Sequence, residues 1–199
     1  MPQLLADFHR RLTELEHTRS RMESLYASGN VAKRDVLIIY EALFIRAVSG
    51  FEHFCEELFF AIVSRRIQYS RSRVSIRIKC KSEVMREIIL QGDKYLDGLP
   101  YERTERRAEL YLAEGKPFTE LTSADRSLLQ TVVTIRHAIA HSGDHAKQKF
   151  HKQVIGSQKV GHGERTPAGF LRSQFRDSPV QNRFQVYVAG LGRIAGQIT

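Results

Sequence analysis

Three side chains that can bind phosphate or move protons lie within the stretch TIRHAIAHSG at residues 134–143. They are Arg136, His137 and His141. An arginine can donate paired hydrogen bonds to a phosphate, and a histidine exchanges protons near neutral pH. These residue types suit chemistry on a phosphodiester, with Arg136 stabilising charge and a histidine transferring a proton.

Two other interpretations fit the same residues. Cationic side chains are common in the last turn of a helix, where they complement its macrodipole. His137, His141 and His145 are also spaced four apart, as zinc ligands on a helix can be, but the stretch has no HExxH glutamate, cysteine cluster or obvious carboxylate partner. We therefore expect no metal and no cofactor. On an ideal helix Arg136 and His141 point about 140° apart, so a long side chain or a local distortion must bring them together.

The composition favours a basic, single-domain protein. The 199 residues include 31 Lys and Arg against 22 Asp and Glu, a net charge of +9. This balance favours phosphate-bearing partners, although a solvated basic surface without a ligand is the alternative. Cys55 and Cys80 lie in an apolar and a basic context, so we expect no disulfide framework. Since no signal-peptide pattern and no membrane-spanning apolar run are found, we expect a cytoplasmic protein without a membrane partner.

Hydrophobic periodicity predicts an all-α fold, with residues 1–199 forming a single helical-bundle domain. Its main helices are expected at residues 1–30, 33–66, 122–143 and 178–198. Thr122 and Asp125 have capping-box spacing, and Ser178 with Pro179 suits the start of the last helix. The second helix is apolar on most sides, so it must be covered by several neighbours or by a second subunit. Because residues 35–63 are too apolar for one small helical domain to cover comfortably, we expect a symmetric homodimer that uses part of this helix.

A basic arm is predicted at residues 65–81, after the second helix. It holds no acidic residue, and its cations are Arg65, Arg66, Arg71, Arg73, Arg77, Lys79 and Lys81. Apolar and polar residues alternate from Val74 to Cys80, which indicates a short strand or an extended arm. We expect this arm to contact a nucleic-acid backbone without reading its sequence, and a solvated basic loop is the alternative.

A glycine pattern near the C-terminus imitates a dinucleotide-binding motif. Gly190, Gly192 and Ala195 have GxGxxA spacing. Such a motif needs a preceding strand, a full following helix and an acidic residue roughly 20 positions later, for which the sequence has no room. We expect that the glycines let a helix pack closely against a neighbour.

The run from Arg136 to His141 resembles the R-[polar]-x3-H signature of the HEPN superfamily, an α-helical group rich in metal-independent ribonucleases. The segment SGFEHFCEEL, which contains Glu52, is similar to the second core helix of this superfamily, which often carries a buried acidic residue. The segment GKPFTELTSADRSLLQTVVTIRHAIAH, the following Ala146 and Phe150, and RTPAGFLR at 165–172 resemble its RiboL-PSP-HEPN branch. The resemblance covers most of residues 33–198.

The resemblance implies that Arg136 and His141 are the catalytic pair and that His137 fills the polar second position. It also implies RNA as substrate, homodimers that bring two motifs toward one RNA groove, and a role in defence or a toxin-like response, with an antitoxin or defence-system partner. Gly143 stands where toxins silenced by nucleotidylation carry a tyrosine, so we do not expect that regulation. Because many superfamily members are not catalytic, a module that binds RNA or nucleotides, or serves as an assembly partner, is the alternative function.

Glu52 is expected to support the motif. Its carboxylate lies beside Phe51, Phe54 and Cys55 in the sequence, so it should need a cationic or hydrogen-bonding partner. Arg136 is the expected partner, and simple exposure on the helix surface is the alternative.

RNA carries its own nucleophile, the 2′-hydroxyl. We expect His141 to deprotonate it, so that cleavage leaves a 2′,3′-cyclic phosphate and a 5′-hydroxyl.

Overall fold

The computed structural model describes residues 2–64, 76, 81–141, 143–156, 158 and 160–199, and it confirms the all-α class. The helices are α1 (Pro2–Ala27), α2 (Lys33–Val63), α3 (Ser82–Leu90), α4 (Tyr101–Tyr111), α5 (Ser123–Ala140), α6 (Asp144–Phe150), α7 (Pro167–Arg172) and α8 (Arg183–Gln197). Short 3-10 turns lie at Ala113–Gly115, Phe118–Glu120 and His162–Glu164, and a π-helical turn at His151–Ile155 follows α6. Strands β1 (Gln174–Asp177) and β2 (Val180–Asn182) form an antiparallel hairpin.

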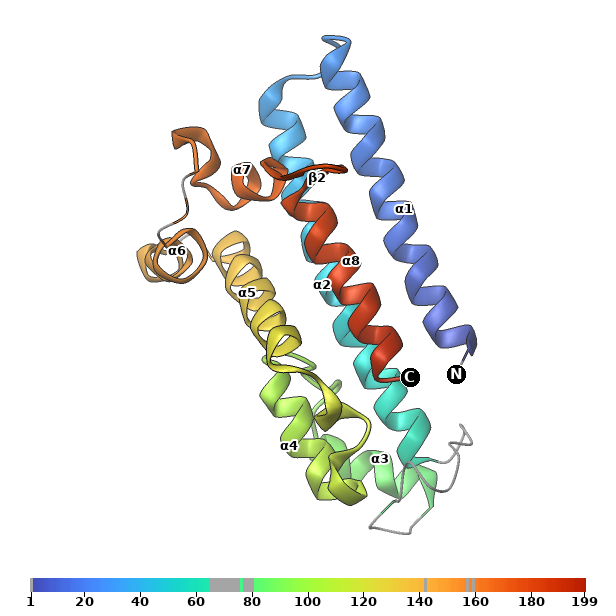
Figure 1. The fold of residues 1–199 in the computed structure, drawn as a ribbon. Helices are drawn as coiled ribbons and strands as arrows, with labels where there is room; N and C mark the ends of the chain where they lie inside the picture. Colours follow the sequence, from blue (N-terminus) through green and yellow to red (C-terminus); the bar gives the residue numbers. More distant parts are fainter. Residues whose placement is uncertain (1, 65–75, 77–80, 142, 157, 159) are drawn as a thin grey trace.

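Helix α2 is the central element of the fold. In Figure 1, α8 lies along it, with α1 on one side and α5 on the other. All three helices, and α7 as well, pack on α2. Phe44, Phe51 and Leu58 are completely buried. Of the two predicted ways to cover this apolar helix, several neighbours or a second subunit, the structure shows the first over most of its surface, and the homodimer stays a prediction.

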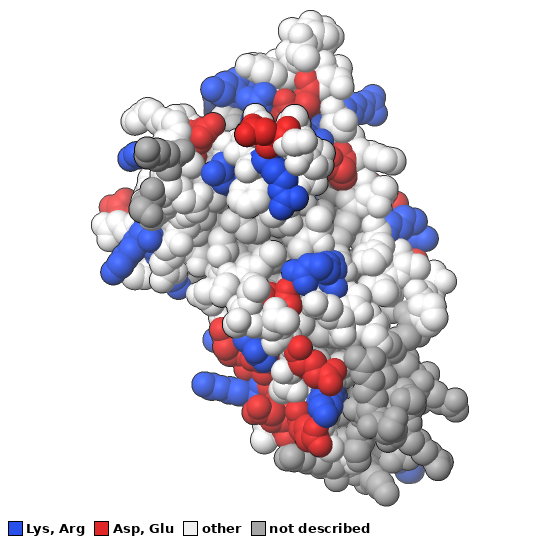
Figure 2. Space-filling model, in the orientation of Figure 1, with Lys and Arg blue, Asp and Glu red and all other residues white. Residues whose placement is uncertain are grey.

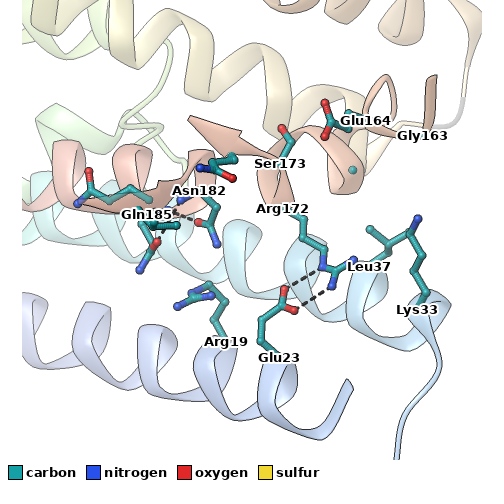
Figure 3. Close-up of a pocket in the computed structure, with 14 residues that line it drawn as sticks. Arg19, Glu23, Lys33, Leu37, Gly163, Glu164, Arg172, Ser173, Asn182 and Gln185 are labelled. Atoms are coloured by element: carbon teal, nitrogen blue, oxygen red, sulfur yellow. Dashed lines mark hydrogen bonds and ion pairs between the residues drawn. The ribbon is translucent and has the colours of Figure 1, made fainter. Parts of the chain in front are cut away.

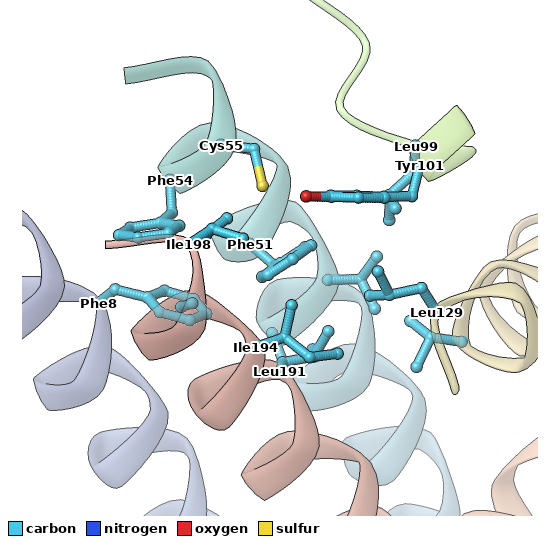
Figure 4. Close-up of a cluster of buried hydrophobic side chains, with 14 of the residues drawn as sticks. Phe8, Phe51, Phe54, Cys55, Leu99, Tyr101, Leu129, Leu191, Ile194 and Ile198 are labelled. Atoms are coloured by element: carbon cyan, nitrogen blue, oxygen red, sulfur yellow. The ribbon is translucent and has the colours of Figure 1, made fainter. Parts of the chain in front are cut away.

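The core fixes how α2 meets its neighbours. Figure 4 shows aromatic and aliphatic side chains from α1, α2, α4, α5 and α8 gathered at one level. Phe8 of α1 stacks on Phe54 of α2 with ring centroids 5.2 Å apart. Leu129 of α5 and Leu191 of α8 are buried in the same cluster. Burial of such side chains contributes roughly 1.5–3 kcal/mol each. The positions of α5 and α2 are therefore set by apolar packing.

Close helix packing explains the glycine pattern in α8. A Cβ atom at Gly190 would lie 2.6 Å from Leu128 Cδ1, and one at Gly192 would lie 3.3 Å from Leu12 Cδ1. The glycines therefore let α8 approach α5 and α1. The preceding strand, β2, belongs to an antiparallel hairpin rather than to a βαβ unit.

The start predicted for the last helix was wrong. Residues near Ser178 and Pro179 form the turn of the β1–β2 hairpin, in which Asp177 pairs with Val180. Helix α8 begins at Arg183, and Asn182 caps it: Gln185 N donates to Asn182 Oδ1 at 3.0 Å. All four residues of β1 are exposed, so the strand has no alternating burial pattern that the sequence could reveal.

The basic arm lies almost entirely outside the described residues. This applies to Arg65, Arg66, Arg71, Arg73, Arg77 and Lys79. Helix α2 ends at Val63, earlier than predicted, and Ile76 makes an isolated antiparallel bridge with Leu112. Lys81 is exposed at the N-cap position of α3. The role of the arm stays a prediction.

Within the described part of the chain, no helix has the length and apolarity needed to cross a membrane.

Helix α5 begins where predicted and ends earlier. Asp125 N donates to Thr122 Oγ1 at 3.2 Å and Thr122 N donates to Asp125 Oδ2 at 3.3 Å, which confirms the capping box. The helix ends at Ala140 instead of residue 143, because His141 adopts an extended conformation with φ −121° and ψ 117°. Gly143 is the N-cap of α6, and Asp144 lies in its first turn.

Candidate functional site

The motif lies in the last turn of α5, at the edge of the core. Leu129, Val132 and Ile135 form the buried stripe of this helix. Arg136 directly follows that stripe, and its side chain keeps 40% of its exposure. The apolar packing of α5 on α2 therefore carries the guanidinium to the side of α2 while leaving it open to a ligand.

Arg136 and Glu52 form an ion pair between α5 and α2. Arg136 Nη2 lies 3.4 Å from Glu52 Oε2, and the Glu52 side chain is 17% exposed. The expected partnership is confirmed. Burial raises the pKa of the Glu52 carboxyl, Arg136 opposes this shift, and the nearby charge of Asp97 adds to it. The net rise shows that desolvation outweighs the attraction of one moderately long ion pair.

The segment from Leu96 to Gly98 covers Glu52 from the other side. A Cβ atom at Gly98 would lie 3.1 Å from Glu52 Cα, so a glycine permits the close approach. Leu96 N donates to Glu56 Oε1 at 3.2 Å, and Thr104 Oγ1 donates to Gly98 O at 2.9 Å. These bonds hold the segment against α2. Sequence reasoning did not identify this contact, because nothing local links residues 52 and 98.

The two motif histidines lie against each other at the surface. The rings of His137 and His141 have centroids 4.2 Å apart and planes inclined by 46°. His141 N still donates to His137 O at 3.0 Å, although the residue has left the helical conformation. The ideal-helix angle between Arg136 and His141 therefore does not apply. Both imidazoles are exposed, so a phosphodiester can reach them.

The surroundings of His137 favour its neutral form. Desolvation is the largest cause that lowers its pKa, followed by the charges of His141, Lys149, Arg136 and His145. A lowered pKa means that the imidazole is unprotonated near pH 7 and can accept a proton or a hydrogen bond. Lys149 and Arg136 thus contribute positive charge near His137.

Two of the residues that lower the pKa of His137 come from α6, and sequence reasoning did not include them in the site. His145 and Lys149 lie on the helix that follows the motif, and α6 packs on α5. The available signal was their four-residue spacing in a short basic helix. That spacing predicts a shared face, but only the packing of α6 on α5 decides which residues the face meets.

The zinc interpretation finds no support in the geometry. Within the described residues, no three His, Cys, Asp or Glu side chains gather as they would around a metal ion. His137 belongs to α5, His141 has left that helix, and His145 belongs to α6. Four-residue spacing therefore does not place these three rings on one helix face.

The charged residues are unevenly distributed. On the face in Figure 2, acidic side chains gather over α4 and lie among basic ones. Helix α4 contains Glu102, Glu105 and Glu109. Basic side chains project at the edge where α6 lies in Figure 1. A polyanion is therefore better accommodated beside α6 than across α4.

A separate polar cavity of about 730 Å³ lies between α1, the start of α2, α7 and the hairpin (Figure 3). Arg172 Nε and Nη2 donate to the two Glu23 oxygens at 2.8 and 2.9 Å, and Tyr40 Oη donates to Glu23 Oε1 at 2.8 Å. Asn182 Nδ2 in turn donates to Tyr40 Oη at 2.9 Å. Arg172 belongs to the RTPAGFLR segment, so this segment ties α7 to α1. Motif residues do not line the cavity.

Comparisons with protein-family models, with curated proteins and with solved structures found no match to this chain. The geometry of the motif and the resemblance of its sequence therefore provide the grounds for a proposed function.

Proposed function

We propose that this chain is a metal-independent endoribonuclease of the HEPN type, acting in the cytoplasm in defence or a toxin-like response. It would cleave RNA by attack of the 2′-hydroxyl, leaving a 2′,3′-cyclic phosphate and a 5′-hydroxyl. The observation that supports this most is the combination of an arginine held by a half-buried carboxylate with two imidazoles in contact nearby.

Arg136 is suited to stabilise the charge that develops on the phosphate. The ion pair with Glu52 engages Nη2, so the other guanidinium donors are available for phosphate oxygens. A fixed guanidinium that meets the developing charge requires little reorganisation during the reaction. Glu52 therefore acts as a positioning residue rather than as a proton carrier.

His141 is assigned the transfer of the 2′-hydroxyl proton. The 2′-oxygen then attacks phosphorus, the bond from phosphorus to the 5′-oxygen breaks, and the leaving 5′-oxygen takes up a proton from water. A general acid at neutral pH has to be protonated, whereas the pKa of His137 is lowered. The lowered pKa of His137 therefore disfavours it as the acid that protonates the leaving group. It suits His137 better as a neutral side chain that orients the phosphate or the His141 ring.

We include a homodimer in the proposal. Its expected contact surface is one stripe along α2, not the whole helix. Along the outer side of this helix, a stripe of exposed or half-buried residues follows a repeated four-then-three spacing. It consists of Ile38, Ala42, Ile45 and Ser49. Such spacing is typical of a helix–helix seam. Because the stripe ends beside Glu52, a second copy docked along it would bring its own Arg136 toward the same groove.

The alternative is a non-catalytic module that binds RNA or nucleotides, or that serves as an assembly partner, for instance of an antitoxin. The exposed cations beside the motif would serve this function equally well. The two functions differ in one requirement, because binding needs positive charge whereas cleavage also needs a histidine that accepts a proton.

The test uses purified protein, EDTA and two RNA oligonucleotides that differ only in the scissile 2′-hydroxyl. We expect cleavage of the natural RNA, none of the 2′-deoxy version, and a loss on the order of 10²–10⁴-fold in His141→Ala. His17→Ala, which removes an exposed histidine from α1, is the matched control and should retain full activity. Cleavage of the 2′-deoxy RNA, or full activity in His141→Ala, would contradict the mechanism.

A further inference from the structure

Helix α6 is anchored by one apolar face. Ala146, Phe150 and Val154 are 5%, 1% and 3% exposed. Phe150 meets Phe170 of α7 edge to face, with ring centroids 5.8 Å apart. Because these residues bury one side of the helix, its remaining sides are presented to solvent in a fixed orientation.

The π-helical turn extends this anchored helix. Gly156 N donates to His151 O at 2.8 Å, a bond that spans five residues. The wider turn allows the consecutive residues Val154 and Ile155 both to be buried. Residues 144–155 thus behave as one firmly held helical unit beside the end of α5. π-turns of this kind are frequent at functional sites.

The exposed side of this unit is rich in basic residues, and the unit packs on the helix that carries the motif. Asp144 is the one acidic residue in the fully described range 144–155, against three lysines and two histidines. His145 and Lys149 are four residues apart and share a face, roughly 6 Å along the helix axis. Both are close enough to His137 for their charges to lower its pKa.

We propose that His145 and Lys149 form a phosphate subsite for the RNA strand adjoining the scissile bond. The inference rests on the proposed function, since it takes the motif as the point of cleavage. Lys149 is half-buried on α6, which packs on α5, and its charge acts on His137. A backbone phosphate held there would fix the register of the strand relative to Arg136. Its contribution would not depend on the base sequence.

The test is the binding of a single-stranded RNA oligonucleotide whose 2′-hydroxyls are replaced by hydrogen, so that no cleavage interferes. Lys149→Gln should weaken binding about fivefold at 0.1 M salt and reduce the slope of log K against log salt by about 0.7, the value for one lost phosphate contact. Lys147→Gln is the matched control, since Lys147 is exposed on the same helix but points about 160° away from Lys149. It should leave both quantities unchanged.

The outcomes separate this inference from the proposed function. If Lys149→Gln binds like the wild type, or if Lys147→Gln is weakened equally, the subsite is refuted while cleavage can still stand. If binding depends on Lys149 but the wild type cleaves no RNA, the subsite is supported and the enzymatic function fails. Wild-type protein that binds no RNA at all would overturn both.

Discussion

Replacing Glu52 by glutamine separates its role in positioning Arg136 from any role in stability. The change keeps the size of the side chain and removes its charge. At 3.4 Å and an effective dielectric constant of about 20, the gross attraction between the two charges is about 5 kcal/mol. However, the pKa of Glu52 is raised, so desolvation outweighs this attraction in the folded state. We therefore expect the free energy of unfolding to change by less than about 1 kcal/mol.

Cleavage should respond much more strongly. Without the carboxylate, the Arg136 side chain loses the contact that fixes its guanidinium. A displacement of about 1 Å in a positioning contact can cost on the order of 10²-fold. We expect the single-turnover rate with excess enzyme to fall by roughly 10- to 100-fold, while RNA binding changes little. Urea unfolding of the same preparation gives the stability.

Glu105 of α4 provides a matched control, because it also pairs with an arginine of α5. Its carboxylate pairs with Arg126 of α5, and the two side chains are 16% and 41% exposed, almost the values for Glu52 and Arg136. Arg126 Nε and Nη2 donate to Glu105 Oε1 at 2.8 and 2.6 Å. Glu105→Gln should lower stability by up to about 1 kcal/mol and leave the cleavage rate unchanged.

The pH dependence of stability gives a second readout for Glu52. A raised pKa means that the native state binds more protons than the unfolded state in the range just above the ordinary pKa of 4.5. The unfolding free energy of the wild type should therefore lose this contribution as pH rises through that range. Glu52→Gln lacks the contribution, so its curve should be flatter there. A rate within twofold of the wild type, or a rate loss that parallels unfolding, would refute the positioning role.

Two further predictions concern assembly and the basic arm. Light scattering at micromolar concentration should give about twice the 22.9 kDa chain mass, and Ile45→Asp, in the outer stripe of α2, should shift it to one chain; a strictly monomeric wild type would remove the composite groove. Replacing Arg71, Arg73 and Arg77 together by glutamine should weaken RNA binding for all sequences and flatten its salt dependence. An unchanged slope would assign the arm to a solvated loop.

The sequence by itself determined the all-α class, the main helices and the motif. Apolar residues at helical spacing report which face of a segment is buried, and the cap at Thr122 is a local interaction within one turn. The expectation that Glu52 pairs with Arg136 also succeeded, because a carboxylate among apolar neighbours has few ways to be satisfied.

Only the tertiary structure decided what each buried face meets. Helices of the same chain cover most of α2, so its apolar surface does not require a partner subunit. The approach of Gly98 to Glu52 brings together residues that are 46 positions apart in the sequence. Periodicity carries no information about such long-range choices, because they depend on how all the apolar faces pack at once. The same holds for the end of α5. His141 leaves the helical conformation, and the chain then turns into α6, whose Lys149 lowers the pKa of His137. No local sequence pattern encodes the direction in which the chain leaves α5, so the sequence could not predict the charges around His137.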